Sequence, residues 1–267
     1  MKKYFCIGLL ILAMTLMAAC GKKPATAHAT KPAASQETTA SVSATATGAS
    51  SAKNETNTSA RNGSEDSSKS TVVLGAVTMG YYSDSSHQGS KVDIKYPIFE
   101  GNDEVNKLIK ETAVDYINEF CGTDYVDLTA DINFQVSYSS NTLVSVIFSG
   151  LVNVRTAAHP NNIFFTVNID PQKSELVKFN DRYQMNSALI NTFYRRAQEQ
   201  VPSYVYSYLT QNRQEIEKDL NSIDDPSSGN YTYSYFTAKG VGISVPTIFA
   251  IGDHAEVELT YADLAQN

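Results

Sequence analysis

The sequence contains no tryptophan and only three cysteines, Cys6, Cys20 and Cys121. Because one cysteine falls in the part predicted to fold, an intramolecular disulfide and a cysteine-based zinc site are excluded there. Cys121 stands at the apolar end of a predicted helix, where we expect a buried, unreactive thiol. None of the four histidines stands three or four residues from another, the spacing of a helical zinc site. The sequence therefore predicts no metal.

Motifs for covalent or phosphoryl chemistry are also missing. The sequence has neither a Gly-X-Ser-X-Gly elbow nor a glycine-rich phosphate loop. Asp224 and Asp225 form an acidic pair before Pro226, and a turn that ends a helix explains this pair better than acid–base catalysis. We therefore expect no catalytic residue, no cofactor and a role other than that of an enzyme.

The N-terminal residues have the pattern of an exported, lipid-anchored chain. A short basic start precedes an apolar run from Tyr4 to Ala19, and the last residues of this run resemble a bacterial lipobox ending at Cys20. We expect residues 1–19 to be a lipoprotein signal peptide and Cys20 to be acylated. The acyl chains would hold the protein at the extracytoplasmic face of the cell membrane. An ordinary signal peptide cleaved near Ala19 is the alternative.

Residues 20–70 are rich in alanine, serine and threonine and have hardly any large apolar side chain. Such a segment buries too little surface to offset the entropy of ordering, so we expect a disordered tether. From residue 71 to 267 the composition changes, and 13 basic residues face 24 acidic ones, a net charge of −11. This balance argues against nucleic acid as a partner. It suits a cationic partner, although solubility alone is the commoner reason for acidity.

Residues 71–267 predict one folded region with subdomains of about 71–157 and 158–267. Apolar residues at three- and four-residue steps predict helices over 102–121, 186–200 and 202–222. Alternating or β-branched segments predict strands over 71–79, 91–99, 131–138, 143–154, 163–169, 176–177, 231–236, 241–245 and 255–261. This order indicates an α+β fold, an antiparallel sheet packed with about three helices.

The segment His159-Pro160-Asn161-Asn162 is one candidate ligand-binding site. The imidazole of His159 and the amides of Asn161 and Asn162 offer hydrogen bonds to a ligand. A hairpin turn is the favoured alternative, because proline fixes φ and asparagine tolerates left-handed geometry.

The second candidate is a run of tyrosines. Tyr231, Tyr233 and Tyr235 alternate along a predicted strand and share one face of it. Flat amphipathic rings suit protein contacts or stacking on a glycan. The alternative is that these rings cover the seam between the sheet and the helices.

Three segments together carry a family resemblance. They are Lys95–Phe99 with the helix after Asn102, Ser145–Gly150 through Ala158–Asn162 to Thr166–Asp170, and Tyr235–Val241 through Val245-Pro246 to Glu256–Leu259. In this order they resemble the extracytoplasmic region shared by the anti-sigma factor RsiV and PdaC-type peptidoglycan deacetylases. The resemblance implies a non-catalytic module, which binds lysozyme in RsiV-like proteins and accompanies a separate catalytic domain in PdaC-like enzymes.

This sequence departs from both kinds of relative. We expect no sigma-binding segment before the apolar run and no deacetylase domain after residue 267. The leading hypothesis is therefore a surface lipoprotein whose domain binds lysozyme or peptidoglycan without catalysis. The alternative is a cell-envelope hydrolase that acts on wall polymers, which clustered carboxylates in a cleft would favour.

Overall fold

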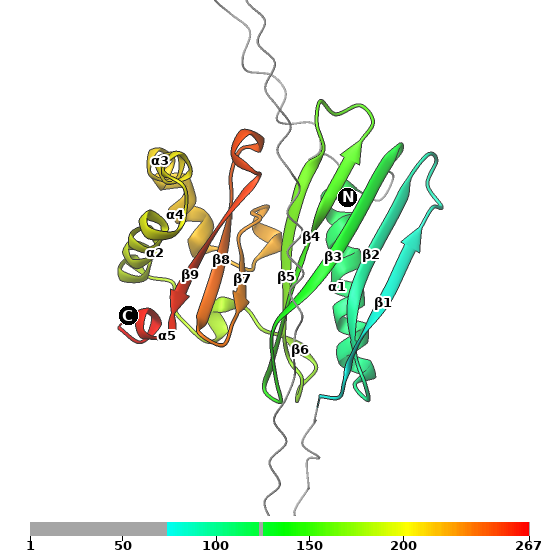
Figure 1. The fold of residues 1–267 in the computed structure, drawn as a ribbon, viewed down its shortest axis with the longest axis horizontal. Coiled ribbons are helices and arrows are strands. Elements are labelled where there is room, and N and C mark those ends of the chain that lie inside the picture. The colour runs from blue at the N-terminus through cyan, green and yellow to red at the C-terminus, as the bar shows by residue number, and fades with distance from the viewer. Residues whose placement is uncertain (1–73, 123–124, 267) are drawn as a thin grey trace, which may run out of the picture. The chain divides into compact units, whose positions relative to one another are not determined.

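The computed structural model describes residues 74–122 and 125–266, and Lys69–Asn267 forms one compact unit. The predicted signal peptide, Cys20 and the predicted tether lie outside the described residues. Strands and helices are both abundant, so the predicted α+β class is confirmed (Figure 1). No helix among the described residues is both long and apolar enough to cross a membrane.

The larger of two sheets has six strands in the order β1-β2-β3-β4-β5-β6. Its strands are β1 (Val77–Asp84), β2 (Lys91–Phe99), β3 (Leu128–Ser140), β4 (Leu143–Val154), β5 (Asn161–Asp170) and β6 (Glu175–Leu176). Because β5 and β6 extend the sheet beyond β4, it continues across the subdomain boundary expected near residue 157.

The sheet is antiparallel, as predicted, except at one place, where β2 and β3 pair in parallel. The helix α1 (Asp103–Cys121) connects these two strands and returns the chain to the end of the sheet where β2 began. A parallel pair requires such a crossover, since a tight turn can only reverse the chain. Apolar residues of α1 at Val105, Ile109, Ala113 and Ile117 are buried against one face of the sheet.

The first strand lies later in the chain than the sequence predicts, at Val77–Asp84 instead of 71–79. Gly80 interrupts the pattern in the sequence but sits inside β1. A Cβ atom at this position would lie 2.4 Å from Cε2 of Tyr96, so the glycine makes room for that ring. A glycine inside a strand often marks a close approach of this kind.

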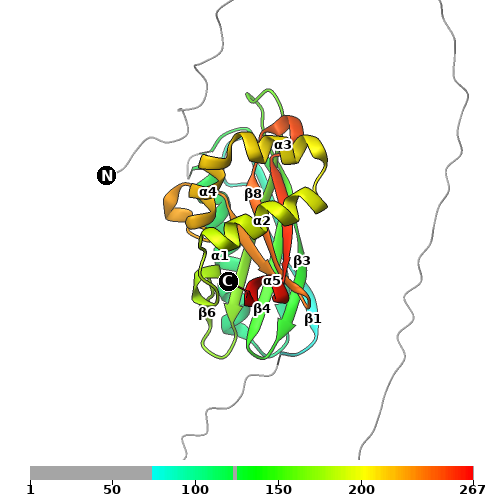
Figure 2. The ribbon, with the colours of Figure 1, turned by 90° about the vertical axis from the view of Figure 1, so that its left-hand side faces the viewer.

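The smaller sheet has three antiparallel strands, β7 (Tyr233–Phe236), β8 (Gly240–Pro246) and β9 (His254–Thr260). One of its faces packs on α2 (Ser187–Gln200), α3 (Ser203–Gln211) and α4 (Arg213–Asn221) (Figure 2). The chain ends in a short helix, α5 (Tyr261–Ala265).

The described residues thus form five α-helices, more than the three expected. The helix predicted over 202–222 is divided at Asn212, which ends α3 and begins α4. The Asn212 side chain donates to the backbone oxygen of Tyr208, and this bond competes with continuation of the helix.

A candidate binding groove beside β5

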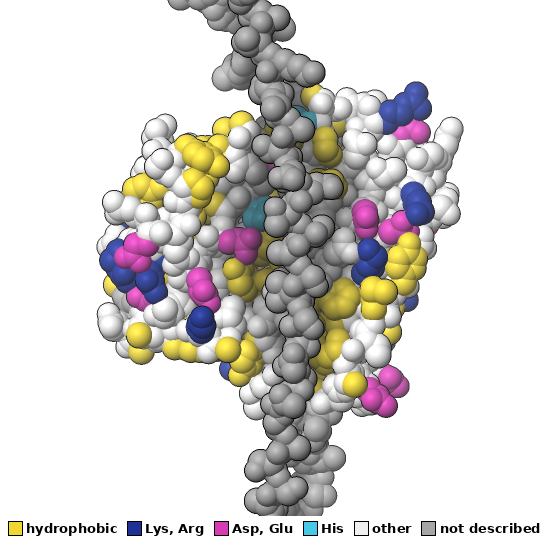
Figure 3. Space-filling view, viewed as in Figure 1, with side chains coloured by type: hydrophobic (Ala, Val, Ile, Leu, Met, Phe, Trp, Pro, Cys, Tyr) yellow, Lys and Arg dark blue, Asp and Glu magenta, His cyan; other side chains and the backbone are white. Residues whose placement is uncertain are grey.

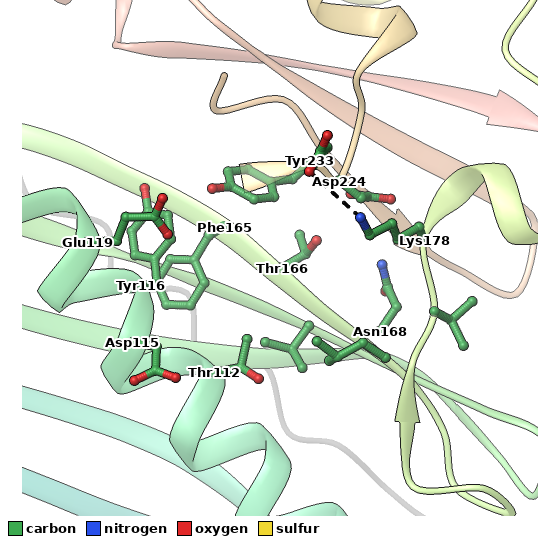
Figure 4. Close-up of a pocket in the computed structure, with 14 residues that line it drawn as sticks. Thr112, Asp115, Tyr116, Glu119, Phe165, Thr166, Asn168, Lys178, Asp224 and Tyr233 are labelled. Atoms are coloured by element: carbon green, nitrogen blue, oxygen red, sulfur yellow. Dashed lines mark ion pairs between the residues drawn. The ribbon is translucent and has the colours of Figure 1, made fainter. Parts of the chain in front are cut away.

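A cavity of about 340 Å³ lies between α1, β5 and the segment that precedes β7 (Figure 4). It opens beside the part of β5 that β6 does not reach, because β6 pairs only with Ile169 and Asp170. The lining residues are Thr112, Asp115, Tyr116, Glu119, Phe165, Thr166, Val167, Asn168, Leu176, Val177, Lys178, Asp224, Asp225 and Tyr233. A smaller hollow shares Tyr116, Glu119 and Tyr233 with it. We call the two together the groove.

The acidic wall of the groove comes from α1. Asp115 and Glu119 are exposed and stand four residues apart, so they lie on one helix face. Glu111 continues this row one turn earlier. Like charges at this spacing destabilise a helix by about 0.2–0.5 kcal/mol per pair. Local helix stability therefore does not account for this row of carboxylates.

The aromatic wall is a stack of buried rings. Tyr116 lies parallel to Phe165 with 3.9 Å between ring centroids, and Tyr233 meets Tyr116 edge-on at 6.0 Å. Burial is the main reason why the pKa values of Tyr116 and Tyr233 are raised above their usual range. Both hydroxyls therefore stay protonated at neutral pH and act as neutral hydrogen-bonding groups.

Charged groups close the opposite side of the groove. Lys178 Nζ lies 3.8 Å from a carboxylate oxygen of Asp225, and both side chains are largely exposed. An exposed pair of this kind contributes little to stability, because water and salt screen it. The hydroxyl of Ser227 donates to Asp225 and is the main reason why the pKa of Asp225 is lowered. Three carboxylates, Asp115, Glu119 and Asp225, thus line the groove together with one ammonium group, that of Lys178.

Asp224 also reaches the groove, but its carboxylate is held inside the protein. One oxygen accepts from the backbone N–H of Ser234 at 2.7 Å. The other accepts from the Ser234 hydroxyl at 2.6 Å and from the Phe179 N–H at 2.7 Å. Burial outweighs these bonds and raises the pKa of Asp224 to about 6. Its φ of 58° places the residue in the left-handed region, which aspartate tolerates.

Asp224 belongs to a chain of polar groups that joins the two sheets. The Ser145 hydroxyl donates to Asn168 Oδ1 at 2.7 Å and accepts from the N–H of Phe236. The Asn168 amide in turn donates to the backbone oxygen of Ser234. Ser145, Asn168 and Ser234 are buried. We call Ser145, Asn168, Asp224 and Ser234 the buried junction.

The His159 turn lies at a second contact between the sheets. The imidazole of His159 stacks on Phe249 with centroids 3.5 Å apart. Both the backbone N–H and the amide of Asn162 donate to one carboxylate oxygen of Asp253, and Asn161 is half-buried as the first residue of β5. We call His159, Asn162, Phe249 and Asp253 the exposed junction. None of its residues lines the groove.

The structure separates the three predicted tyrosines. Tyr233 lines both hollows of the groove, and Tyr231 lines the smaller one with its ring edge on Phe120. Tyr235 lies elsewhere, with its ring over Gly242 and its hydroxyl donating to Glu256 at 2.8 Å. Two of the six predicted ligand-binding residues therefore meet in the groove.

Sequence reasoning missed the charged residues of the groove. The four-residue spacing of Glu111, Asp115 and Glu119 was the available signal, whereas nothing local connects Lys178 with α1. No three histidine, cysteine, aspartate or glutamate side chains are grouped to hold a metal ion within residues 74–122 and 125–266. Cys121 is half-buried, which differs from the fully buried thiol expected.

Comparisons with known proteins give only neighbours in fold. No family model and no curated protein matches the chain. The fold is similar to the crystal structure of a DUF3298 family protein from Pseudomonas aeruginosa PAO1, with a TM-score of 0.43 and 14% identity over 73% of this chain and 94% of that one. The crystal structure of a DUF3298 family member from Bacteroides fragilis NCTC 9343 is similar with a TM-score of 0.44 and 13% identity. This match covers 71% of this chain and 92% of that one. Neither likeness carries an argument about function, and the resemblance to the RsiV and PdaC region stays a prediction.

Proposed function

We propose that this chain is an extracytoplasmic lipoprotein whose folded domain binds a cationic protein without catalysing a reaction, and that lysozyme is the first candidate ligand. The observation that carries the proposal is the groove, whose lining holds three carboxylates, those of Asp115, Glu119 and Asp225, and a single ammonium group, that of Lys178. The net charge of −11 over residues 71–267 also favours a cationic partner.

The groove has the chemistry to receive a lysine or arginine side chain. Carboxylates attract the cation over distance and raise the rate of encounter. The exposed ring of Tyr231 offers a face for a cation at the smaller hollow. Asp225 can exchange its weak pairing with Lys178 for a cation of the ligand.

Binding accounts for the titratable groups of the groove better than hydrolysis does. Asp224 has the raised pKa of a general acid, and Asp225 beside it has a lowered one, a pattern found in glycosidases. This pattern supports a wall hydrolase as the second candidate. However, both oxygens of Asp224 accept hydrogen bonds from Ser234 and Phe179, so the carboxyl group is occupied structurally.

Peptidoglycan is an alternative ligand for the same groove. Its sugars stack on flat aromatic rings, and Tyr231 presents one at the surface. Amino groups of its peptides would meet the carboxylates of α1.

The test is binding of the full chain, purified in detergent, to lysozyme by calorimetry and to insoluble peptidoglycan by pelleting. We expect lysozyme binding that weakens as salt is raised, and no release of soluble sugar from the wall polymer. If the chain binds peptidoglycan but not lysozyme, peptidoglycan becomes the proposed ligand. Release of sugar that Asp224→Asn abolishes would replace binding by hydrolysis, and retention by neither ligand would refute it.

The predicted anchor has its own test. Cys20→Ser removes the thiol that would be acylated, so we expect the variant to leave the membrane fraction and to lose labelling by palmitate. Cys121→Ser, which removes the thiol of the folded part, is the matched control. Membrane retention of the Cys20→Ser chain would contradict the anchor.

A further inference from the structure

Within residues 74–122 and 125–266, β1 is an edge strand of the six-stranded sheet. It pairs with β2 along its whole length, from Val77 to Asp84, and no other described strand pairs with it. Between Val77 and Ser83 it has no lysine, arginine or proline. These residues, together with bulges and covering elements, are the usual devices that stop edge strands from pairing with other chains.

The opposite edge of the same sheet is protected. β6 has only two residues. Beyond it, the segment at Ser234 lies along β5 and accepts hydrogen bonds from Thr166 and Asn168. The contrast identifies β1 as the edge that remains available for pairing.

The exposed face of β1 is apolar. Val77, Met79 and Tyr81 alternate along the strand and are 46%, 63% and 54% exposed. They point away from α1, since Lys110 of that helix lies over the ring of Tyr82 on the other face. Figure 3 shows hydrophobic side chains gathered with basic and acidic ones on the β1–β2 side of the molecule. A strand with both a free edge and an apolar row is a site for association.

We propose that β1 pairs in antiparallel fashion with β1 of a second copy, about a twofold axis at Gly80. Residues opposite each other in an antiparallel pair share a face. The axis at Gly80 therefore sets Met79 opposite Tyr81 of the second copy, and Val77 opposite its Ser83. The two most exposed large hydrophobic side chains of the strand cover each other, and the two six-stranded sheets join into one.

The charge around β1 favours a second copy of this chain, and not the cationic ligand of the groove, as the partner that pairs with its outer edge. The strand beside β1 presents Lys91, Asp93 and Lys95, and Lys91 pairs with Asp93 at 2.5 Å. This edge thus lacks the acidic excess of the domain as a whole, so net charge opposes the approach of two copies here less than that excess would. The proposal rests on β1 alone and does not depend on the groove.

Sedimentation velocity of the full chain in detergent, over a range of concentrations, tests the pairing. We expect a reversible dimer, and Met79→Lys with Tyr81→Lys should raise its dissociation constant on the order of 100-fold, because the lysines would face each other. The control is Tyr204→Lys on α3, where the native side chain is 60% exposed. A monomer at all concentrations, or a lysine variant that dimerises as tightly as the unchanged chain, would overturn the proposal.

A second variant covers the case in which the lysines prevent folding. Met79→Cys with Tyr81→Cys should give a disulfide-linked dimer when membranes are oxidised, since opposite Cβ atoms lie about 4.5–5.5 Å apart. The same treatment of the Tyr204→Cys chain should give no disulfide-linked dimer. Absence of the linked dimer in a folded Met79→Cys, Tyr81→Cys chain would also overturn the pairing.

Discussion

Two of the contacts between the two sheets have opposite character. In the buried junction, Ser145, Asn168 and Ser234 are almost completely shielded from water, and Asp224 links them to Phe179. The exposed junction consists of one stacked ring pair and two hydrogen bonds to the carboxylate of Asp253.

The difference shows which contact fixes the groove. A buried polar group without its partner costs more than the same group at the surface, where water replaces the partner. Lys178 and Asp225 of the groove stand next to Phe179 and Asp224, so the buried junction determines where they lie. The exposed junction can change with little effect on the fold or the groove.

Asp224→Ala tests the buried junction most severely. The substitution leaves the N–H groups of Phe179 and Ser234 and the Ser234 hydroxyl without their acceptor. Each loss costs about 1–3 kcal/mol, and relief from burying a charge offsets part of the total. We expect the free energy of unfolding in urea to fall by about 3 kcal/mol at pH 7. An unchanged value would show that the junction does not hold the sheets together.

The pH dependence of stability provides the second test. Because the pKa of Asp224 is about 6 in the folded chain, above its ordinary value of 3.8, the folded state binds the proton more tightly. Stability from this group is complete below pH 4 and is lost as the pH rises through 6, a change of about 3 kcal/mol. Urea unfolding from pH 4 to 7 should therefore show a steeper loss in the unchanged chain than in Asp224→Asn. Parallel curves would contradict the assignment.

Asp263 gives an internal control of opposite sign. Burial alone would raise its pKa, but bonds from Thr260 and Arg195 lower it to about 2. Its contribution is present above pH 4 and is lost as the pH falls toward 2. In the Asp263→Asn chain, the free energy of unfolding should therefore fall less between pH 4 and pH 2 than in the unchanged chain. The change that Asp224 causes between pH 4 and pH 7 should stay the same.

Ser145→Ala is expected to have a smaller effect. It removes the donor to Asn168 and the acceptor for the N–H of Phe236, which are both buried. We expect a loss of about 1–3 kcal/mol in urea unfolding, with no change in pH dependence. Ser149→Ala, in the same strand at an exposed position, is the control.

Asp253→Ala should have the smallest effect. Water can replace the carboxylate that Asn162 contacts, because Asn162 is exposed. We expect a loss below about 1 kcal/mol, and the same for His159→Ala. A loss as large as that of Asp224→Ala would mean that the two junctions are equivalent and would remove the distinction between them.

Local patterns predicted much of the fold. The apolar stripe of α1 and the short turns between β3, β4 and β5 were readable because each depends on residues close in sequence. The division of the helix at Asn212 and the position of Gly80 inside β1 were not. They depend on a side chain that bonds its own backbone and on the ring of Tyr96 across the sheet.

The candidate site was less predictable than the fold. Tyr231 and Tyr233 were expected together, but Asp115, Glu119 and Lys178 reach the same groove from segments about sixty residues apart in sequence. The role of Asp224 was also hidden, because a turn after a helix explains an Asp-Asp-Pro sequence locally. Its hydrogen bonds with Phe179 and Ser234, which are distant in sequence, show that this carboxylate is turned into the protein.

The most direct test of the account compares two double variants of α1 in binding to lysozyme. Asp115→Asn with Glu119→Gln, and Asp103→Asn with Glu104→Gln, remove the same charge from exposed positions of one helix, but only the first pair lines the groove. We predict that calorimetry at low salt gives at least about tenfold weaker binding for the groove pair and less than about threefold weaker binding for the control. Equal weakening by both pairs would show that net charge alone attracts the ligand and would contradict the groove as its site.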